Sequence, residues 1–375
     1  MSSKIHNQYL PDYVSPPGET LLEVLEEIGM SQADLAERTG RPKKTISEII
    51  NGKAAITPDT ALQLERVLGI SASFWNSREQ KYRAFLARQQ EQSRLQEQIA
   101  WLDKVPVNEM VKVGWIEKSK QKEKSKQKVE QLQIVLNYFG VVSPEQCDVY
   151  WDSRALAFRK SVAFESDRIA TNAWLRKGEL EAQKTDCAPY EAEKFKRALE
   201  EIRGFTVENP KEAISKVRQL CAAAGVVVVL VPSLKGVRAS GVTRWLTSTK
   251  AIIQLSLRYK RDDHFWFTFF HEARHVLQEK KREIFIETDD KKRDYDPNDL
   301  MEQDANTFAA NLLIPELALQ QFLARKKLDD EAIELFASEI GIAPGIVVGR
   351  LQRDVCLLHS QCNDLKRRFD WDEMN

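Results

Sequence analysis

The 375-residue chain lacks paired cysteine motifs, net charge and long apolar runs. Its five cysteines are an odd number without a CxxC pair, which argues against a disulfide framework or a cysteine-ligated zinc knuckle and favours a reducing, cytoplasmic environment. Basic and acidic residues both number 56, so nucleic-acid binding would need a local patch. No apolar stretch approaches the length of a signal segment or a membrane span, so no membrane association is expected.

The N-terminal residues carry closely spaced start and stop signals for helices. Ser31 is a good N-cap with a weak capping-box partner in Asp34, and Gly40 supplies a left-handed stop. Thr57 starts a later helix in the same way. Two short helices joined by a tight turn and framed by two more are typical of a helix-turn-helix domain. We therefore predict an all-α DNA-binding domain over 1–75.

The second helix of the pair, 42–51, is predicted to contact DNA. Residues 1–75 hold seven basic and ten acidic side chains, yet 38–53 holds five basic residues and one acid, Glu48. Such a local basic face suits contact with phosphates. The alternative is a small helical bundle for protein contact with solvated lysines. The candidate DNA-binding residues are Arg41, Lys43, Lys44, Thr45, Ser47 and Lys53.

The segment 16–75 resembles the HigA-type branch of the XRE-like helix-turn-helix family, above all in its NGK and ITPDTALQL pieces. The resemblance implies operator binding to double-stranded DNA, as a homodimer, and a partner toxin. The recognition helix departs from the family at its opening PKK.

Residues 76–205 are predicted to form a helical connector whose role is not legible from the sequence. Its start, with Trp75 before it, should dock on the first domain. The charged linker 117–128, EKSKQKEKSKQK, is interpreted as a solvated helix or mobile linker rather than a phosphate-binding tract. Arg159 and Ser161 are candidate contacts with a partner, with packing as the default.

The C-terminal part, 206–375, combines strands with a long apolar helix. VVVVLV (226–231) reads as a buried strand, and 239–246 and 251–257 as strands joined by TSTK. Strand 239–246 is either an exposed edge that accepts an extended peptide or a simple sheet strand. The helical pattern after them completes an α+β domain.

The motif FTFFHEARHVLQ on that helix places His271 and His275 four residues apart, so that both imidazoles lie on one face and can share a metal ion. Glu272 lies about 100° around the helix, where it suits a general base that takes a proton from water activated by zinc. Because the chain has five histidines, a chance HExxH is expected in roughly fewer than one such chain in a hundred.

A third ligand is sought in LMEQDANTFAANLLIP (300–315). Glu302 lies 27 residues beyond His275 and shares a helix face with Asn306 and Ala309. Asp304 competes, but it points about 200° away from Glu302. We predict Zn²⁺ bound by His271, His275 and Glu302, with His264 and His359 as fallback ligands.

FWFTFFHEARHVLQ followed by EQDANTFAANLLIP resembles the ImmA/IrrE family of metallopeptidase-like proteins, in the version fused behind HigA-type domains. The resemblance implies a zincin-like fold with His271, His275 and Glu302 as ligands and Glu272 as base. It also implies a role in stress or mobile-element regulation. Arg274 departs from the glycine common there, so Arg274 needs space or an acidic partner.

Two functions remain open at this point. The first is a regulator that binds an operator and cleaves a repressor or another protein with its zinc endopeptidase domain. The second is a non-catalytic, antitoxin-like repressor whose metallopeptidase fold only binds a partner such as a toxin. The oxyanion stabiliser of the peptidase is not identified, and His359 and Arg244 are the candidates.

Overall fold

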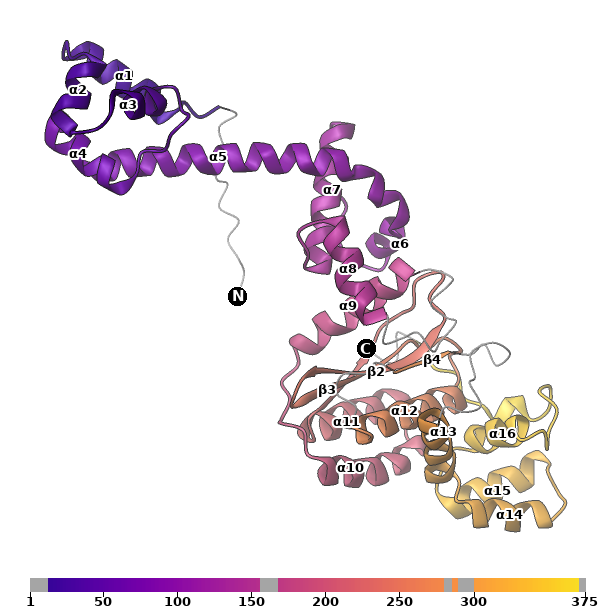
Figure 1. Ribbon diagram of the computed structural model, residues 1–375. Helices are drawn as coiled ribbons and strands as arrows, with labels where there is room; N and C mark the ends of the chain where they lie inside the picture. Colours follow the sequence, from indigo (N-terminus) through magenta and orange to yellow (C-terminus); the bar gives the residue numbers. More distant parts are fainter. Residues whose placement is uncertain (1–12, 156–167, 280–284, 289–299, 371–375) are drawn as a thin grey trace. The chain divides into compact units, whose positions relative to one another are not determined.

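The computed structural model describes residues 13–155, 168–279, 285–288 and 300–370. It divides the chain into two compact units, Met1–Ile99 and Ala100–Asn375 (Figure 1). Arg159 and Ser161 lie outside the described residues.

From residue 13 onward, where its description begins, the first unit consists of helices joined by turns and loops. Its elements are α1 (Pro17–Glu27), α2 (Gln32–Thr39), α3 (Lys43–Ile50), α4 (Pro58–Leu68) and α5 (Ala72–Gln98). Ser31 Oγ accepts a hydrogen bond from the Asp34 amide at 3.1 Å, and Asp34 Oδ2 accepts one from the Ser31 amide at 3.2 Å. This capping box is complete, and Gly40 follows α2 in the left-handed conformation at φ 67°. The predicted helix-turn-helix domain is confirmed.

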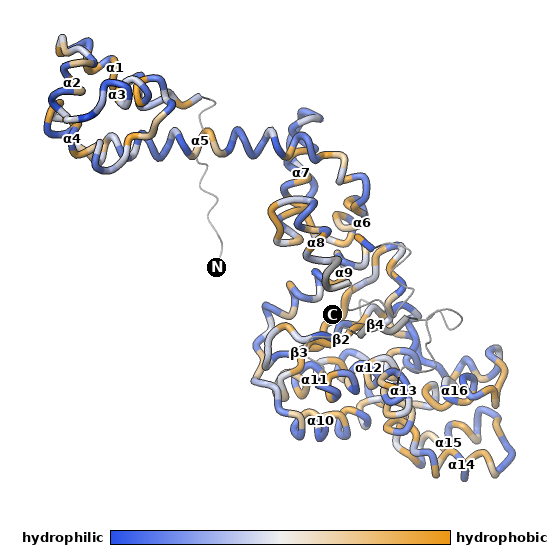
Figure 2. The backbone as a smooth tube through the Cα atoms, in the orientation of Figure 1, coloured by the Kyte–Doolittle hydropathy of each residue, from blue (hydrophilic) through white to orange (hydrophobic). Residues whose placement is uncertain are grey.

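The core of the first unit joins α1 to α5. Leu21, Leu35, Ile46 and Trp75 are fully buried in it. Ile28 is 50% exposed, because it follows the last turn of α1. The second half of α5 is largely hydrophilic (Figure 2), as its run of Gln, Glu and Arg requires.

The second unit begins with short helices. They are η1 (Ile99–Lys104), α6 (Val107–Lys112), α7 (Lys124–Phe139), α8 (Pro144–Ala155) and α9 (Arg168–Gln183). The lysine-rich segment 117–128 is tied to α7 through Gln131, whose Oε1 accepts from the Ser119 amide at 2.9 Å and whose Nε2 donates to the Glu117 carbonyl at 3.2 Å. Residues 117–123 are not helical and only 124–128 belong to α7, so the interpretation as a solvated helix holds for the second half of the segment alone.

A four-stranded mixed sheet lies in the second unit. Its strands are β1 (Val226–Leu230), β2 (Ala239–Thr247), β3 (Lys250–Leu255) and β4 (Phe285–Thr288). Their order is β1-β3-β2-β4, with β1 parallel to β3 and the other pairs antiparallel. Strand β2 is therefore an inner strand, and the expectation that it is an exposed edge for a substrate peptide is wrong.

Helices cover both faces of the sheet (Figure 1). On one face lies α9, where the Trp174 indole donates to the Val231 carbonyl at 3.0 Å and the Gln254 amide donates to the Trp174 carbonyl at 2.7 Å. On the other face Val228 and Ile253 share a core with α10 (Ala192–Gly204), α11 (Pro210–Ala223) and α12 (Asp262–Leu277). The predicted α+β architecture is confirmed.

After β4 the chain continues through α13 (Leu300–Leu313), α14 (Glu316–Ala324), α15 (Asp330–Ile340) and α16 (Pro344–Arg353). Two 3-10 turns complete the second unit, one between α10 and α11 at Phe205–Val207 and one after α16 at Asn363–Leu365. Phe336 and Ile346 place α15 and α16 in the core of the second unit. Among the described residues, no single helix is long and apolar enough to cross a membrane; only α15 and α16 together reach that length and composition, as a pair bent by 112°.

Candidate metal centre and nucleic-acid interface

Three donor side chains converge between α12 and α13. His271 and His275 are buried on α12, and their Nε2 atoms are 3.0 Å apart. Glu302, on the first turn of α13, places Oε2 at 3.3 Å from His271 Nε2 and Oε1 at 3.3 Å from His275 Nε2. The three residues expected as ligands from the sequence are thus brought together in one cluster.

The geometry and chemistry of the cluster fit a zinc ion. A tetrahedral zinc with bonds of about 2.0–2.1 Å keeps its ligand atoms roughly 3.3–3.4 Å apart, close to the separations here. Burial raises the pKa of the Glu302 carboxyl, but the hydrogen bonds and charge of the two histidines outweigh burial and hold that pKa well below its usual range. Two imidazoles and one carboxylate are also a donor set of catalytic zinc sites, which leave one position for water.

Each histidine is oriented by an amide oxygen. His271 Nδ1 lies 3.1 Å from Asn306 Oδ1, and His275 Nδ1 lies 2.9 Å from Gln278 Oε1. An amide oxygen only accepts, so both Nδ1 atoms carry a proton and both Nε2 atoms face the cluster, where a neutral imidazole would offer its lone pair to a metal ion. Sequence reasoning assigned no role to Asn306 or Gln278. Asn306 lies four residues after Glu302 and Gln278 lies three residues after His275, and these helical spacings could have indicated both roles.

Arg274 has an acidic partner, Asp304, as expected from the sequence. Its Nε and Nη2 bind Asp304 Oδ2 and Oδ1 at 2.7 and 3.2 Å, and its guanidinium lies 5.2 Å from the Phe308 ring centroid. Gln278 Nε2 also donates to Asp304 Oδ2 at 2.9 Å. Asp304, the rival ligand, is therefore engaged away from the cluster, and a chain of contacts runs from Arg274 to His275.

Glu272 is fully buried between α12 and β2. A Cβ atom added to Gly241 would lie 2.8 Å from Glu272 Oε1 and 2.7 Å from Thr268 Cγ2, closer than side chains tolerate. Thr243 Oγ1 donates to the Glu272 carbonyl at 2.9 Å. Gly241 thus allows the strand to approach the helix at Glu272, a role that sequence reasoning did not assign to it.

The remaining candidates lie elsewhere. His264 stacks on Tyr259 with ring centroids 4.4 Å apart, and His359 is an exposed residue that follows α16; neither belongs to the donor cluster. Arg244 is wrong as an oxyanion stabiliser, because alternation along β2 turns it to the α9 face, where it donates to the Leu175 carbonyl. Arg353 lies 4.8 Å from the ring centroid of Phe267, and that ring lies 6.3 Å from the His271 ring, centroid to centroid.

The candidate DNA-binding face centres on α3. Lys43, Lys44 and Lys53 are exposed. Thr45 and Ser47 are half-buried, and Arg41 is half-buried too, with its Nε donating to Gln63 Oε1 at 2.5 Å. The structure therefore leaves the lysines as the most accessible cations of the predicted set and ties Arg41 to α4.

Two family models match this chain, one in each of its two units. Residues 21–75 match the helix-turn-helix family model, and residues 221–352 match the IrrE N-terminal-like domain of the M78 peptidase family. Virulence-associated protein A of Dichelobacter nodosus is 42% identical over 52 residues, which are 14% of this chain and 51% of that protein. The uncharacterized HTH-type transcriptional regulator YddM of Escherichia coli is 36% identical over 59 residues, 16% of this chain and 63% of that one.

A HigA-family addiction module antidote protein from Coxiella burnetii, of known structure, is 31% identical and covers 22% of this chain and 91% of that chain, with a TM-score of 0.21. The chain spans about half to five-eighths of the length of the curated relatives given above.

Fold, cluster and comparisons define a chain whose first unit is a helix-turn-helix domain and whose second unit carries a metallopeptidase-like domain. The chain belongs to the proteins in which an XRE-like helix-turn-helix domain is fused to an IrrE N-terminal-like domain.

Proposed function

We propose that this chain is a DNA-binding regulator whose second unit is a zinc-dependent endopeptidase. One observation carries the proposal: the Nε2 atoms of His271 and His275 and the carboxylate of Glu302 converge within 3.0–3.3 Å beside the buried Glu272. A site built only to hold a metal has no need of a buried glutamate between its two histidines.

The residues divide the chemistry among them. His271, His275 and Glu302 would hold the ion, which when bound supplies Lewis-acid activation of water and of the scissile carbonyl. Glu272 would accept the proton from the attacking water and deliver it to the leaving amine. Asn306 and Gln278 hold the imidazoles in the orientation that this requires.

The proposed cellular role joins both units. α3 would bind a double-stranded operator, with the chain as a homodimer. The substrate would be a protein of the same regulatory circuit, such as a repressor, a toxin or the chain itself. The resemblance to HigA-type and ImmA/IrrE-type proteins supports a role in stress response, toxin-antitoxin control or mobile-element control.

Glu272→Gln tests the peptidase. The variant keeps the size of the side chain but removes the base, so it should retain zinc while losing cleavage by at least about a hundredfold. Proteins captured by the zinc-loaded variant are identified and then incubated with the wild type, and their fragments are measured by mass spectrometry. Glu279→Gln, at an exposed position after the same helix, is the matched control.

Undiminished cleavage by Glu272→Gln would remove the base from the mechanism. Wild-type protein that purifies without near-stoichiometric zinc and cannot be loaded with it would favour the alternative, a non-catalytic repressor whose second unit only binds a partner.

A further inference from the structure

A lysine-rich segment leads into α7, and neither the proposed operator contact nor the proposed peptidase chemistry uses it. Residues 117–128 read EKSKQKEKSKQK and hold six lysines and two glutamates. We name this segment the lysine tract. All six of its lysines are exposed, and no apolar residue occurs in it. The lysine tract therefore offers a basic and wholly polar surface to solvent.

The first half of the lysine tract is held against α7 although it is not helical. Ser119 is buried, and its amide donates to Gln131 Oε1 at 2.9 Å. Its hydroxyl donates to Glu130 Oε2, which also accepts from the Lys120 amide at 3.2 Å. With Ser119 turned inward, Lys118 and Lys120 on either side of it face solvent. The lysines are thus carried by an anchored backbone, which a ligand would not have to order on binding.

Most lysines of the tract lack an acidic partner. Lys120 Nζ lies 3.6 Å from Glu117 Oε2, and Lys126 Nζ lies 3.0 Å from Glu123 Oε2. Even with the neighbouring Glu130 included, six lysines against three carboxylates leave a net charge of +3. The lysines of the tract that form no ion pair with any described residue are Lys118, Lys122, Lys124 and Lys128.

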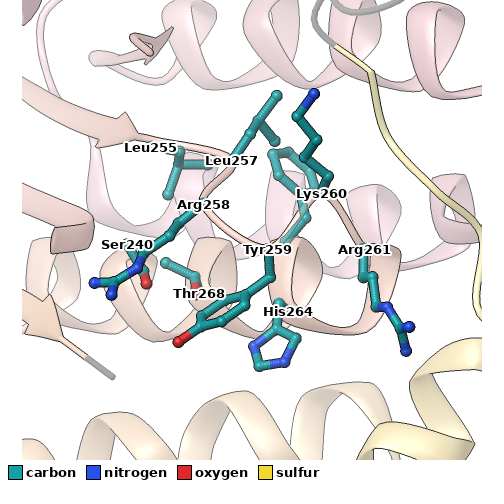
Figure 3. A pocket seen from close by; sticks show the side chains of 10 residues that line it. Ser240, Leu255, Leu257, Arg258, Tyr259, Lys260, Arg261, His264 and Thr268 are labelled. Atoms are coloured by element: carbon teal, nitrogen blue, oxygen red, sulfur yellow. The ribbon is translucent and has the colours of Figure 1, made fainter. Parts of the chain in front are cut away.

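Cations that line a pocket at the start of α12 provide a contrast (Figure 3). Lys260 Nζ lies 3.3 Å from Asp370 Oδ1. Arg261 Nη1 donates to Asn363 Oδ1 at 3.0 Å, and Arg258 Nη1 donates to a backbone carbonyl at 2.6 Å. These three cations are used within the fold, whereas four lysines of the tract are available to an external anion.

The positions of Lys124 and Lys128 are unfavourable for α7 itself. They lie in its first two turns, near the positively polarised end of the helix dipole, and their spacing of four residues brings like charges together. The first turn of α7 also has no hydrogen bond from a capping side chain. A pattern that opposes helix stability without an internal contact in return is expected where function requires it. A bound anion would relieve both unfavourable interactions.

The chemistry of the tract indicates which anion it fits. Lysine is a hydrated point charge, and a group of lysines contacts phosphates without reading bases. A helix that lies on a membrane needs an apolar face, which the tract does not have. The first unit is a helix-turn-helix domain, so duplex DNA is the polyanion that the rest of the chain favours.

We propose that the lysine tract is a second DNA-contacting surface, in which Lys118, Lys122, Lys124 and Lys128 bind backbone phosphates of double-stranded DNA without sequence preference. The inference goes beyond operator recognition by α3 and beyond the peptidase, and it depends on neither.

The test removes three of the unpaired lysines from the full-length protein, in the variant Lys122→Gln/Lys124→Gln/Lys128→Gln. Glutamine removes the charge and keeps a good helix propensity. Affinity for a mixed-sequence 30-base-pair duplex is measured by fluorescence anisotropy between about 0.05 and 0.2 M salt. Each lost phosphate contact lowers the slope of log affinity against log salt by about 0.9, so the slope should fall by about 2.7 and the affinity at about 0.15 M salt roughly thirtyfold.

A matched control removes the same charge from three exposed positions elsewhere in the second unit. The control variant is Lys194→Gln/Lys211→Gln/Lys326→Gln. It weakens long-range attraction equally but removes no proposed contact, so its slope should fall by less than about 0.9. Both variants are repeated in the Lys43→Ala/Lys44→Ala background, where the effect of the tract should persist if it is independent of α3.

Equal slopes in the tract variant and the control would overturn the proposal. A tract variant that unfolds at a lower temperature than wild type would also overturn it, because relief of charge repulsion in α7 should leave the thermal transition unchanged or raise it. Vesicles of phosphatidylserine and phosphatidylcholine test the competing ligand. Sedimentation with these vesicles that requires the three lysines, together with an unchanged slope on the duplex, would assign the tract to a lipid surface instead.

Discussion

The two units of the chain are specified by interactions of very different range. In Met1–Ile99 the signals are local: Ser31 caps α2 through Asp34, three residues away, and Gly40 ends it. In Ala100–Asn375 the cluster depends on contacts between helices, with Glu302 27 residues from His275 in the sequence. The comparison suggests that the first unit tolerates changes in the second, whereas the metal cluster depends on how α12 and α13 are held together.

The largest effect is expected when a donor of the cluster is removed. His275→Ala takes away one of three donors and should lower zinc affinity by more than about a hundredfold. This exceeds the loss of roughly tenfold to a hundredfold that follows when only a hydrogen-bond partner of a metal ligand is removed. Zinc affinity is measured by competition with a chromophoric chelator. Binding to a mixed-sequence 30-base-pair duplex, followed by fluorescence anisotropy, should not change, and a parallel loss of both activities would contradict the independence of the units.

A smaller effect on the same cluster is expected from Gln278. Gln278→Leu removes the acceptor of the His275 Nδ1 proton and the link to Asp304, so zinc affinity should fall about tenfold to a hundredfold. Gln278→Glu restores an acceptor for the His275 Nδ1 proton but loses the hydrogen bond to Asp304, so it should recover only part of the loss. Gln320→Leu, an exposed position on α14, is the control. Equal affinity of Gln278→Leu and wild type would show that the cluster does not rely on this contact.

The lysines of α3 provide the converse test in the first unit. Lys43→Ala with Lys44→Ala removes two exposed cations and should weaken binding to the 30-base-pair duplex roughly tenfold at 0.15 M salt, while the slope of log affinity against log salt falls by about 1.8. Zinc affinity should stay constant. Lys81→Ala on α5, outside the predicted interface, is the control, and an unchanged salt slope in the double variant would remove α3 from the interface.

The same contrast explains which features could be predicted from the sequence. Caps, glycine stops and the HExxH spacing act within one or two turns of helix, so the helices α2, α3 and α12 were predicted correctly. The choice of Glu302 over Asp304 also followed from helix geometry, and the structure shows Asp304 bound to Arg274.

Features that depend on pairing between distant segments were not predictable in this way. Strand β4 has four residues, and only its pairing with β2 makes β2 an inner strand. The face of the sheet to which Arg244 points depends on which face of β2 packs against α9 and which against α12. No local sequence pattern gives that information. Gly241 could be interpreted only after Glu272 was found packed against it.

The smallest effect is expected at the cap of α2. Ser31→Ala removes the acceptor for the Asp34 amide and should lower the free energy of unfolding of the first unit by about 1 kcal/mol. For a unit of this size that corresponds to a melting shift of roughly 4–8 °C, measured by differential scanning calorimetry. The exposed Ser93→Ala is the control, and its transition should stay within about 0.5 kcal/mol of wild type. If the zinc-dependent transition of the second unit moved together with that of the first, the two units would unfold cooperatively, and local specification of the first unit would not make it independent of the second.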